Sequence, residues 1–146
     1  MLYTLQYYSS LPEQAKQIRQ EVFVDEQGFQ EEFDDADDIA VHFLLFVDGQ
    51  AAATCRTFYD AEQGCPVVGR IAVRKDYRGQ QLGAAVLHGA EVYIAQHGGE
   101  KVMLAAQERA RGFYEKQGYT GTGEPFYEEY CPHIWMQKEL SFSKES

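Results

Sequence analysis

The spacing of apolar and polar residues changes several times along the chain, and each change predicts a new element. Residues 2–8 alternate loosely and predict an opening strand. Residues 41–47 and 50–59 are apolar runs that flank Asp48-Gly49, the strongest short hairpin signal in the sequence. Three later apolar runs predict further strands, at residues 67–73, 101–106 and 134–140.

Helical spacing occurs in three places between these strands. Ser10-Leu-Pro-Glu13 is a capping-box pattern with proline in the first turn, and it precedes one apolar face formed by Leu11, Ala15, Ile18 and Val22. Residues 82–96 predict a longer helix that ends at Gly98-Gly99. A short helix is predicted over residues 110–117, where Gly118 stops it.

A hairpin followed by strand, helix, strand, helix and strand is typical of the α/β class, with a mixed central β-sheet flanked by helices. The 146 residues suit a single domain over residues 1–146, with a core large enough for stability. The polar tail at residues 141–146 is predicted to be frayed.

Composition and charge narrow the classes of function. The chain is 45% hydrophobic and carries a net charge of −10, so it predicts a packed globule with no basic surface for nucleic acid or an anionic membrane. Its first residues lack a basic region, and no apolar run approaches twenty residues. A cytoplasmic protein is therefore expected.

The three cysteines, Cys55, Cys65 and Cys131, are scattered and favour reduced thiols. Cys131-Pro-His133 offers two metal ligands, but no further pair accompanies it, so no metal site is predicted. The phosphate-binding loop of nucleotide triphosphatases is also missing from the sequence.

The segment that says most about function is the junction between the strand at residues 67–73 and the helix at residue 82. A charged turn at residues 74–77 leads into Arg78-Gly79 and then into Leu82-Gly83. Unpaired N–H groups and the positive end of the dipole at a helix start can hold a pyrophosphate, and glycine lets the backbone approach it. An ordinary strand-to-helix loop capped by glycine is the alternative reading.

This block resembles the cofactor-binding motif of the GNAT family of acyl-CoA-dependent N-acetyltransferases, whose pattern is [Arg/Gln]-x-x-Gly-x-[Gly/Ala]. The pattern falls on residues 78–83, with Gln81 where the family usually has glycine. Residues 110–119 resemble the family's later motif, Ala-x-x-Phe-Tyr-x-x-x-Gly-[Phe/Tyr]. Residues 22–42, together with Phe126-x-Glu128 and His133-x-x-Met136, are similar to its ElaA/YjcF-like branch.

The resemblance implies an enzyme that binds acetyl-CoA and an amine together and transfers the acetyl group directly to a primary amine. It implies that the pyrophosphate is held by Arg78, Gly79, Gln80, Gln81, Leu82, Gly83 and Ala84. The pantetheine arm would lie along Ile71, Ala72 and Val73, with a backbone N–H near Val73 polarising the thioester carbonyl. Gln107 stands where many relatives carry a cofactor-contacting asparagine, and Tyr114 stands at the position of the family's acid.

The acceptor amine must lose a proton before it attacks, because the unperturbed pKa of an amine is near 10. The groups that could remove this proton are Glu26, Glu32, Asp34, Asp37, His42, Glu128 and His133. Of these, Glu26, Glu32 and His133 are predicted as catalytic. Eight acidic residues between Asp25 and Asp38 either form a solvated surface or attract a small cationic acceptor.

A non-catalytic acyl-CoA-binding module is the alternative function, and a structural domain without a cofactor is a third. The sequence is compatible with a homodimer, and it does not identify the acceptor.

Overall fold

The computed structural model describes residues 2–141 of the chain, so most of the tail predicted to fray, residues 142–146, lies outside the described residues. Seven strands hydrogen bond in the order β1-β2-β3-β4-β5-β7-β6. The sheet contains parallel and antiparallel pairs, and the predicted α/β class with a mixed sheet is confirmed. The strands are β1 (Tyr3–Tyr8), β2 (Val41–Val47), β3 (Gln50–Asp60), β4 (Cys65–Val73), β5 (Lys101–Gln107), β6 (Thr120–Glu128) and β7 (Cys131–Glu139).

Three α-helices lie between these strands in the described part of the chain: α1 (Glu13–Arg19), α2 (Leu82–Gln96) and α3 (Arg111–Lys116). A π-helix, η1 (Gln20–Glu26), continues directly from α1. Short 3-10 turns add η2 (Asp35–Asp38), η3 (Lys75–Tyr77) and η4 (Glu108–Ala110).

The chain divides into two compact units. The first contains the residues up to Phe58 together with Val68–Ala90, and the second contains Tyr59–Val67 and the residues from Glu91 onward. Strand β4 and helix α2 each contribute residues to both units. The single-domain reading of residues 1–146 stays a prediction.

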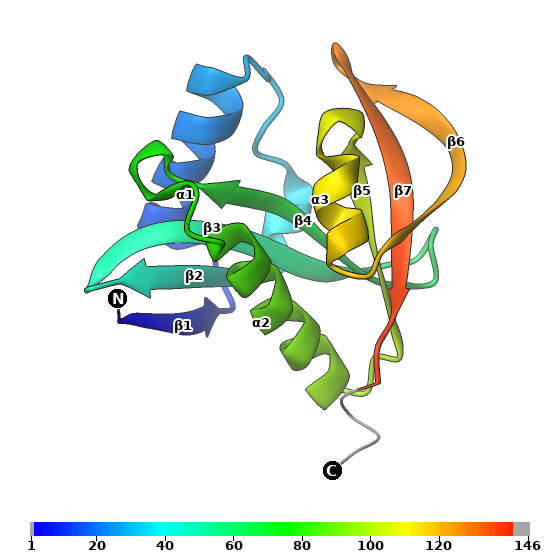
Figure 1. The fold of residues 1–146 in the computed structure, drawn as a ribbon, viewed down its shortest axis with the longest axis horizontal. Helices are drawn as coiled ribbons and strands as arrows, with labels where there is room; N and C mark the ends of the chain where they lie inside the picture. The colour runs from blue at the N-terminus through cyan, green and yellow to red at the C-terminus, as the bar shows by residue number, and fades with distance from the viewer. Residues whose placement is uncertain (1, 142–146) are drawn as a thin grey trace. The chain divides into compact units, whose positions relative to one another are not determined.

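In the first unit, β1, β2 and β3 lie side by side as an antiparallel meander (Figure 1). The predicted hairpin is confirmed: Asp48 and Gly49 join β2 to β3 with φ angles of 49° and 85°. Both residues accept a positive φ at low cost, and two such residues make the turn that matches the twist of paired strands. The β2 side chains Phe43, Leu44 and Leu45 form part of the core.

Of the predicted apolar face, Ala15 and Ile18 are buried in α1 and Val22 is buried in η1, whereas Leu11 lies before the helix and is half-buried. The capping-box prediction is wrong, since Pro12 is the N-cap residue and no side chain caps the helix. The π-helical continuation into η1 was not predicted from the sequence. Helices of this kind are rare overall, and many of those known lie at functional sites.

In the second unit, β7 pairs antiparallel with both β5 and β6. Strand β6 was not predicted, because Gly121, Gly123 and Pro125 interrupt it and most of its residues are at least half-exposed. Its register with β7 shifts between Thr122 and Phe126, which marks an irregular stretch around these residues. Strand β7 begins three residues before the predicted start at Ile134.

Candidate functional site

The strand-to-helix turn that the sequence singled out lies in the first unit. After β4, the 3-10 turn η3 leads to Arg78, Gly79 and Gln81, and α2 begins at Leu82 as predicted. Gly79 has a φ of 82° and Gln81 a φ of 64°, so the backbone enters the left-handed region twice within three residues. Gln81 closes the first turn of the helix, because its carbonyl accepts the N–H of Ala85 at 3.2 Å.

This geometry leaves backbone N–H groups available to an anion. The first N–H groups of a helix have no acceptor within it, and alternating backbone conformations form a concave nest of donors. Residues 78–81 are exposed, whereas Leu82 is buried and anchors the start of α2. A Cβ atom built on Gly79 would meet no atom within 4 Å, so the space beside this backbone is open among the described residues. The turn can therefore receive a phosphate.

The left-handed conformation of Gln81 explains why glycine is common at the fourth position of the motif. Glycine adopts a positive φ without strain, whereas a residue with a Cβ atom pays about 1–2 kcal/mol for it. Gln81 adopts a backbone conformation that glycine would adopt without strain. Its departure from the pattern is therefore compatible with the turn.

Two arginines flank this turn, and both contact the α1–η1 helix. Arg78 donates from Nε to the carbonyl of Val73 at 3.1 Å and from Nη2 to Oε1 of Glu26 at 2.5 Å. Arg74 donates from Nη1 to the carbonyl of Ala51 at 3.2 Å, and its Nε lies 3.4 Å from Oε1 of Glu21. The structure thus brings together three of the predicted site residues, Glu26, Val73 and Arg78.

The end of β4 carries the predicted pantetheine segment. Ala72 is buried, and Ile71 and Val73 are half-buried. Just before them, Arg70 has a φ of 55° in the middle of the strand, a strained conformation for a residue with a side chain. The Arg70 side chain turns to the acidic segment of residues 31–38.

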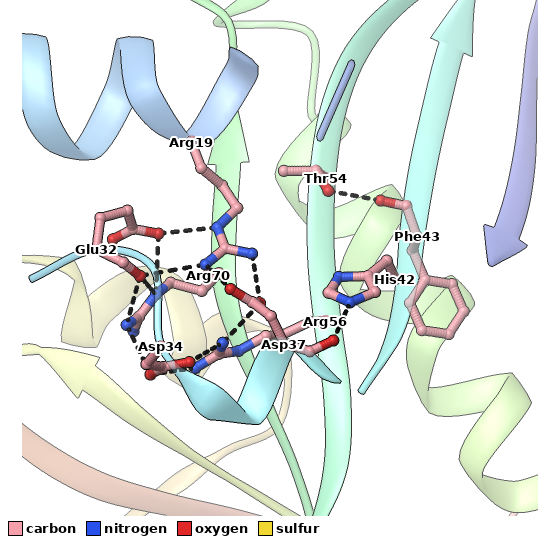
Figure 2. A network of polar contacts seen from close by, with 9 residues as sticks. All are labelled: Arg19, Glu32, Asp34, Asp37, His42, Phe43, Thr54, Arg56 and Arg70. Carbon is pink, nitrogen blue, oxygen red and sulfur yellow. Dashed lines mark hydrogen bonds and ion pairs between the residues drawn. The ribbon is translucent and has the colours of Figure 1, made fainter. Parts of the chain in front are cut away.

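That acidic segment forms what we call the buried ion-pair network, which contains Arg19, Glu32, Asp34, Asp37, Arg56 and Arg70 (Figure 2). Four of these residues are buried, Arg70 is half-buried, and the Asp34 side chain is 43% exposed. Arg19 is 1% exposed and donates from Nε to Glu32 Oε2 at 2.9 Å. Its Nη1 and Nη2 donate to the two oxygens of Asp37 at 2.7 and 3.1 Å, a bidentate pair.

The other two arginines complete the network from β3 and β4. Arg56 donates from Nη1 to both Asp34 and Asp37, at 2.6 and 2.8 Å. Arg70 places its Nε 2.9 Å from Oε2 of Glu32 and its Nη2 3.3 Å from Oδ2 of Asp34. Three carboxylates thus face three guanidinium groups, and their formal charges cancel.

The network changes the proton affinity of its carboxylates in different directions. Burial raises the pKa of Glu32 against the opposing effect of its arginines. For Asp37 burial also acts upward, but hydrogen bonds from Arg19 and Arg56 prevail and lower its pKa to about 2. Glu32, which was predicted from the sequence as a catalytic base, is 4% exposed and ion-paired to two arginines.

Neither sequence reading of the acidic segment described this arrangement, because Glu32 and Asp37 are buried rather than on a solvated surface. The sequence nevertheless contains a signal for buried ion pairs. Arg19 lies four residues after Ala15 on the apolar face of its helix, and Arg56 interrupts the apolar run of β3. A buried arginine requires a carboxylate partner, so these positions point to an acidic segment packed over them.

His42, another candidate for the base, belongs to the edge of this network. Its ring is 1% exposed, and Nε2 lies 3.0 Å from the carbonyl oxygen of Asp37 (Figure 2). Burial lowers the pKa of this imidazole, which favours the neutral ring. The geometry is that of a hydrogen-bonded core histidine.

In the second unit, Gln107 and His133 stand directly opposite each other on β5 and β7. His133 is 5% exposed; its Nδ1 lies 3.0 Å from the carbonyl of Cys131, and its Nε2 lies 3.6 Å from Oε2 of Glu128. Nδ1–H can donate to that carbonyl, which leaves Nε2 beside the carboxylate. The Oε1 atom of Gln107 accepts a hydrogen bond from Arg109 Nε at 2.7 Å.

Tyr114 lies in α3 of the second unit, within a small aromatic group. Its ring meets those of Phe113 and Tyr119 edge to face, with centroid distances of 5.0 and 6.2 Å. The Tyr119 hydroxyl donates to the buried carboxylate of Glu91 at 2.7 Å, and Lys138 reaches its other oxygen at 3.0 Å. Tyr114 therefore packs against a tyrosine ring that is itself anchored by a hydrogen bond to a buried carboxylate.

The described residues also bear on two other kinds of site, a metal site and a membrane span. Within residues 2–141 no three His, Cys, Asp or Glu side chains are grouped as metal ligands would be. None of the helices in that range has the length and hydrophobicity needed to cross a membrane. Cys55, Cys65 and Cys131 are buried, and none of them forms a disulfide within residues 2–141.

Comparison with known proteins gives a family match over most of the chain. The profile described as the acetyltransferase (GNAT) domain matches residues 9–140. YjcF of Bacillus subtilis, described as an N-acetyltransferase, is 30% identical over 125 residues, which cover 84% of this chain and 88% of YjcF. The protein ElaA of Escherichia coli is 30% identical over 129 residues, which cover 85% and 84%.

Solved structures agree with this match. The crystal structure of Escherichia coli ElaA superposes with a TM-score of 0.83 at 26% identity, covering 94% of this chain and all of that chain. An acyl-CoA N-acyltransferase from Pseudomonas aeruginosa superposes with a TM-score of 0.79 at 27% identity, covering 94% and 98%. The resemblance stated from the sequence motifs is confirmed.

Proposed function

Since this chain belongs to the GNAT acetyltransferase family, we propose that it transfers an acetyl group from acetyl-CoA directly to a primary amine. The observation that carries the proposal is the turn at residues 78–81. It combines the family pattern, two left-handed residues and the start of the fifteen-residue helix α2. These features fit a pyrophosphate, because backbone donors and the helix dipole both favour an anion there.

The cofactor supplies the activated thioester, and the residues of this chain bind and orient it. Residues 78–84 would hold the pyrophosphate with their backbone N–H groups, while Leu82 fixes the helix start in the core. Ile71, Ala72 and Val73 would provide main-chain partners for the pantetheine arm. A backbone N–H near Val73 would stabilise the negative charge that develops on the thioester oxygen. Gln107 is proposed to contact the cofactor as well.

The acceptor amine needs a group that removes its proton. Glu26, Glu32 and His133 remain the proposed groups, and their contacts differ. Glu26 and Glu32 are ion-paired to arginines, whereas His133 places Nε2 near the carboxylate of Glu128. Ion pairs with arginines occupy the carboxylates of Glu26 and Glu32, so these contacts favour His133 as the group that removes the proton.

The departing CoA thiolate needs a proton or a hydrogen bond, and Tyr114 is proposed to supply it from its phenol. Changing Tyr114 to phenylalanine keeps the ring and its edge-to-face contacts but removes the donor. General acid assistance is worth about 10²–10⁴-fold in rate, so turnover should fall by about that factor. The CoA dissociation constant should change little.

The experiment measures thiol release over a panel of small amines and CoA binding by calorimetry. Tyr59→Phe is the matched control, because this exposed tyrosine of β3 loses the same hydroxyl outside the proposed site. Near-normal turnover in Tyr114→Phe would show that another group protonates the thiolate. Tight CoA binding without turnover on any amine would instead identify a non-catalytic acyl-CoA-binding module.

A further inference from the structure

The contact between Arg78 and Glu26 has a consequence for how the turn receives an anion. The guanidinium of Arg78 is held at two points, by the Val73 carbonyl at the end of β4 and by the Glu26 carboxylate at the end of η1. The side chains are 44% and 33% exposed, so water and ions reach this pair. Arg78 is thus accessible but already partnered.

The π-helix explains why carboxylates face both arginines of the turn. Its hydrogen bonds run between residues five apart, so a π-helical turn brings residues at that spacing toward one face. Glu21 and Glu26 are five apart in η1, and they contact Arg74 and Arg78 respectively. The helix therefore presents two negative charges to the turn that is proposed to bind a pyrophosphate.

A carboxylate in this position opposes a phosphate in two ways. It occupies a guanidinium N–H that a phosphate oxygen would take, and it repels the incoming negative charge. Like charges a few ångströms apart repel each other in water, and they repel more strongly near a protein surface. An anion at the turn must therefore displace Glu26 from Arg78 or share the guanidinium at reduced affinity.

We propose that Glu26 is a latch: its carboxylate holds Arg78 in the cofactor-free protein and is displaced when the CoA pyrophosphate binds. The proposal rests on the proposed function, because it assumes that the cofactor binds at this turn. A cation that draws Glu26 away from Arg78 should raise the affinity for CoA. By thermodynamic linkage, bound CoA should then raise the affinity for that cation by the same factor. A cationic amine acceptor would be such a ligand.

The test compares CoA binding by calorimetry in the wild-type protein, Glu26→Gln and Asp25→Asn at low and high salt. Asp25→Asn is the matched control, because it removes the same charge one residue away, where the carboxylate contacts Gln20 and not Arg78. Glu26→Gln should bind CoA about three- to fivefold more tightly at low salt, the range expected for an exposed ion pair, and high salt should reduce the gain. Asp25→Asn should gain much less.

Two further measurements localise the effect. In an Arg78→Gln background, Glu26→Gln should gain much less CoA affinity, because the partner of the latch is gone and only the repulsion between Glu26 and the phosphate remains. Pantetheine, which lacks the pyrophosphate, should bind the wild-type protein and Glu26→Gln with equal affinity. Unchanged or weaker CoA binding by Glu26→Gln, or an equal gain in Asp25→Asn, would overturn the latch. Failure of the wild-type protein itself to bind CoA would instead overturn the proposed function.

Discussion

Replacing Asp37 with asparagine should destabilise the protein strongly, because this carboxylate joins two buried guanidinium groups. It accepts hydrogen bonds from Arg19 at 2.7 and 3.1 Å and from Arg56 at 2.8 Å. An asparagine keeps one acceptor oxygen but places an NH₂ group against a guanidinium N–H and removes the charge. Breaking a buried ion pair by changing one partner costs about 3–5 kcal/mol, a large part of the 5–15 kcal/mol typical of a whole protein.

The lowered pKa of Asp37 reflects the same hydrogen bonds from Arg19 and Arg56. A fall from 3.8 to about 2 means that the folded protein favours the ionised carboxylate by about 2 kcal/mol. Between these two pH values the unfolded chain binds more protons than the folded one, so this stabilisation is complete above pH 3.8 and is lost as the pH falls toward 2. The asparagine variant has no such group to titrate.

Urea unfolding monitored by the single tryptophan, Trp135, measures both effects, because urea is uncharged and does not screen ion pairs. Asp38→Asn is the matched control, since Asp38 is an exposed acid of the same 3-10 turn. The control should remain within about 0.5 kcal/mol of the wild type. A loss in Asp37→Asn no larger than that of the control, or a difference from the wild type that does not narrow below pH 4, would refute the reasoning.

Two other substitutions test local features of the two units. Gln81→Gly should raise the free energy of unfolding by about 1 kcal/mol, because glycine accepts the φ of 64° without strain, and a lower urea midpoint would contradict this. Tyr119→Phe removes one of the donors to the buried Glu91 carboxylate and should lower the free energy of unfolding by about 1–3 kcal/mol. Tyr127→Phe, at an exposed tyrosine of β6, should leave the urea midpoint unchanged, and an equal loss there would contradict the role of the Tyr119 hydroxyl.

The features that could be predicted from the sequence are those that neighbouring residues determine. The Asp48-Gly49 turn and helix α2 formed at the predicted bounds, because turn chemistry and helical spacing act over a few residues. The motif turn at residues 78–83 is local in the same sense. Strand β6 was missed because its glycines and proline give it little strand character, and its conformation depends on pairing with β7.

The buried ion-pair network could not be predicted in this way, because the fold brings its members together from α1, the acidic segment, β3 and β4. No spacing in the sequence relates Arg19 to Asp37 or Asp37 to Arg56. The same holds for the facing pair Gln107 and His133, which depends on the register of β5 against β7. The conformation of the turn at residues 78–81 therefore depends on nearby residues, whereas the contacts of the acidic segment and of His133 depend on the whole fold.

The network also limits which acids could attract the proposed cationic acceptor. Glu32, Asp34 and Asp37 are neutralised by three arginines within contact distance, so little of their field extends into solvent. Exposed members of the same segment, such as Asp35 and Asp38, are not among these ion pairs. Long-range attraction of an ammonium group depends on charges that are not compensated nearby. The steering proposed from the acidic segment therefore rests on exposed acids without such ion pairs, while the buried Glu32 and Asp37 hold the segment on β3 and β4.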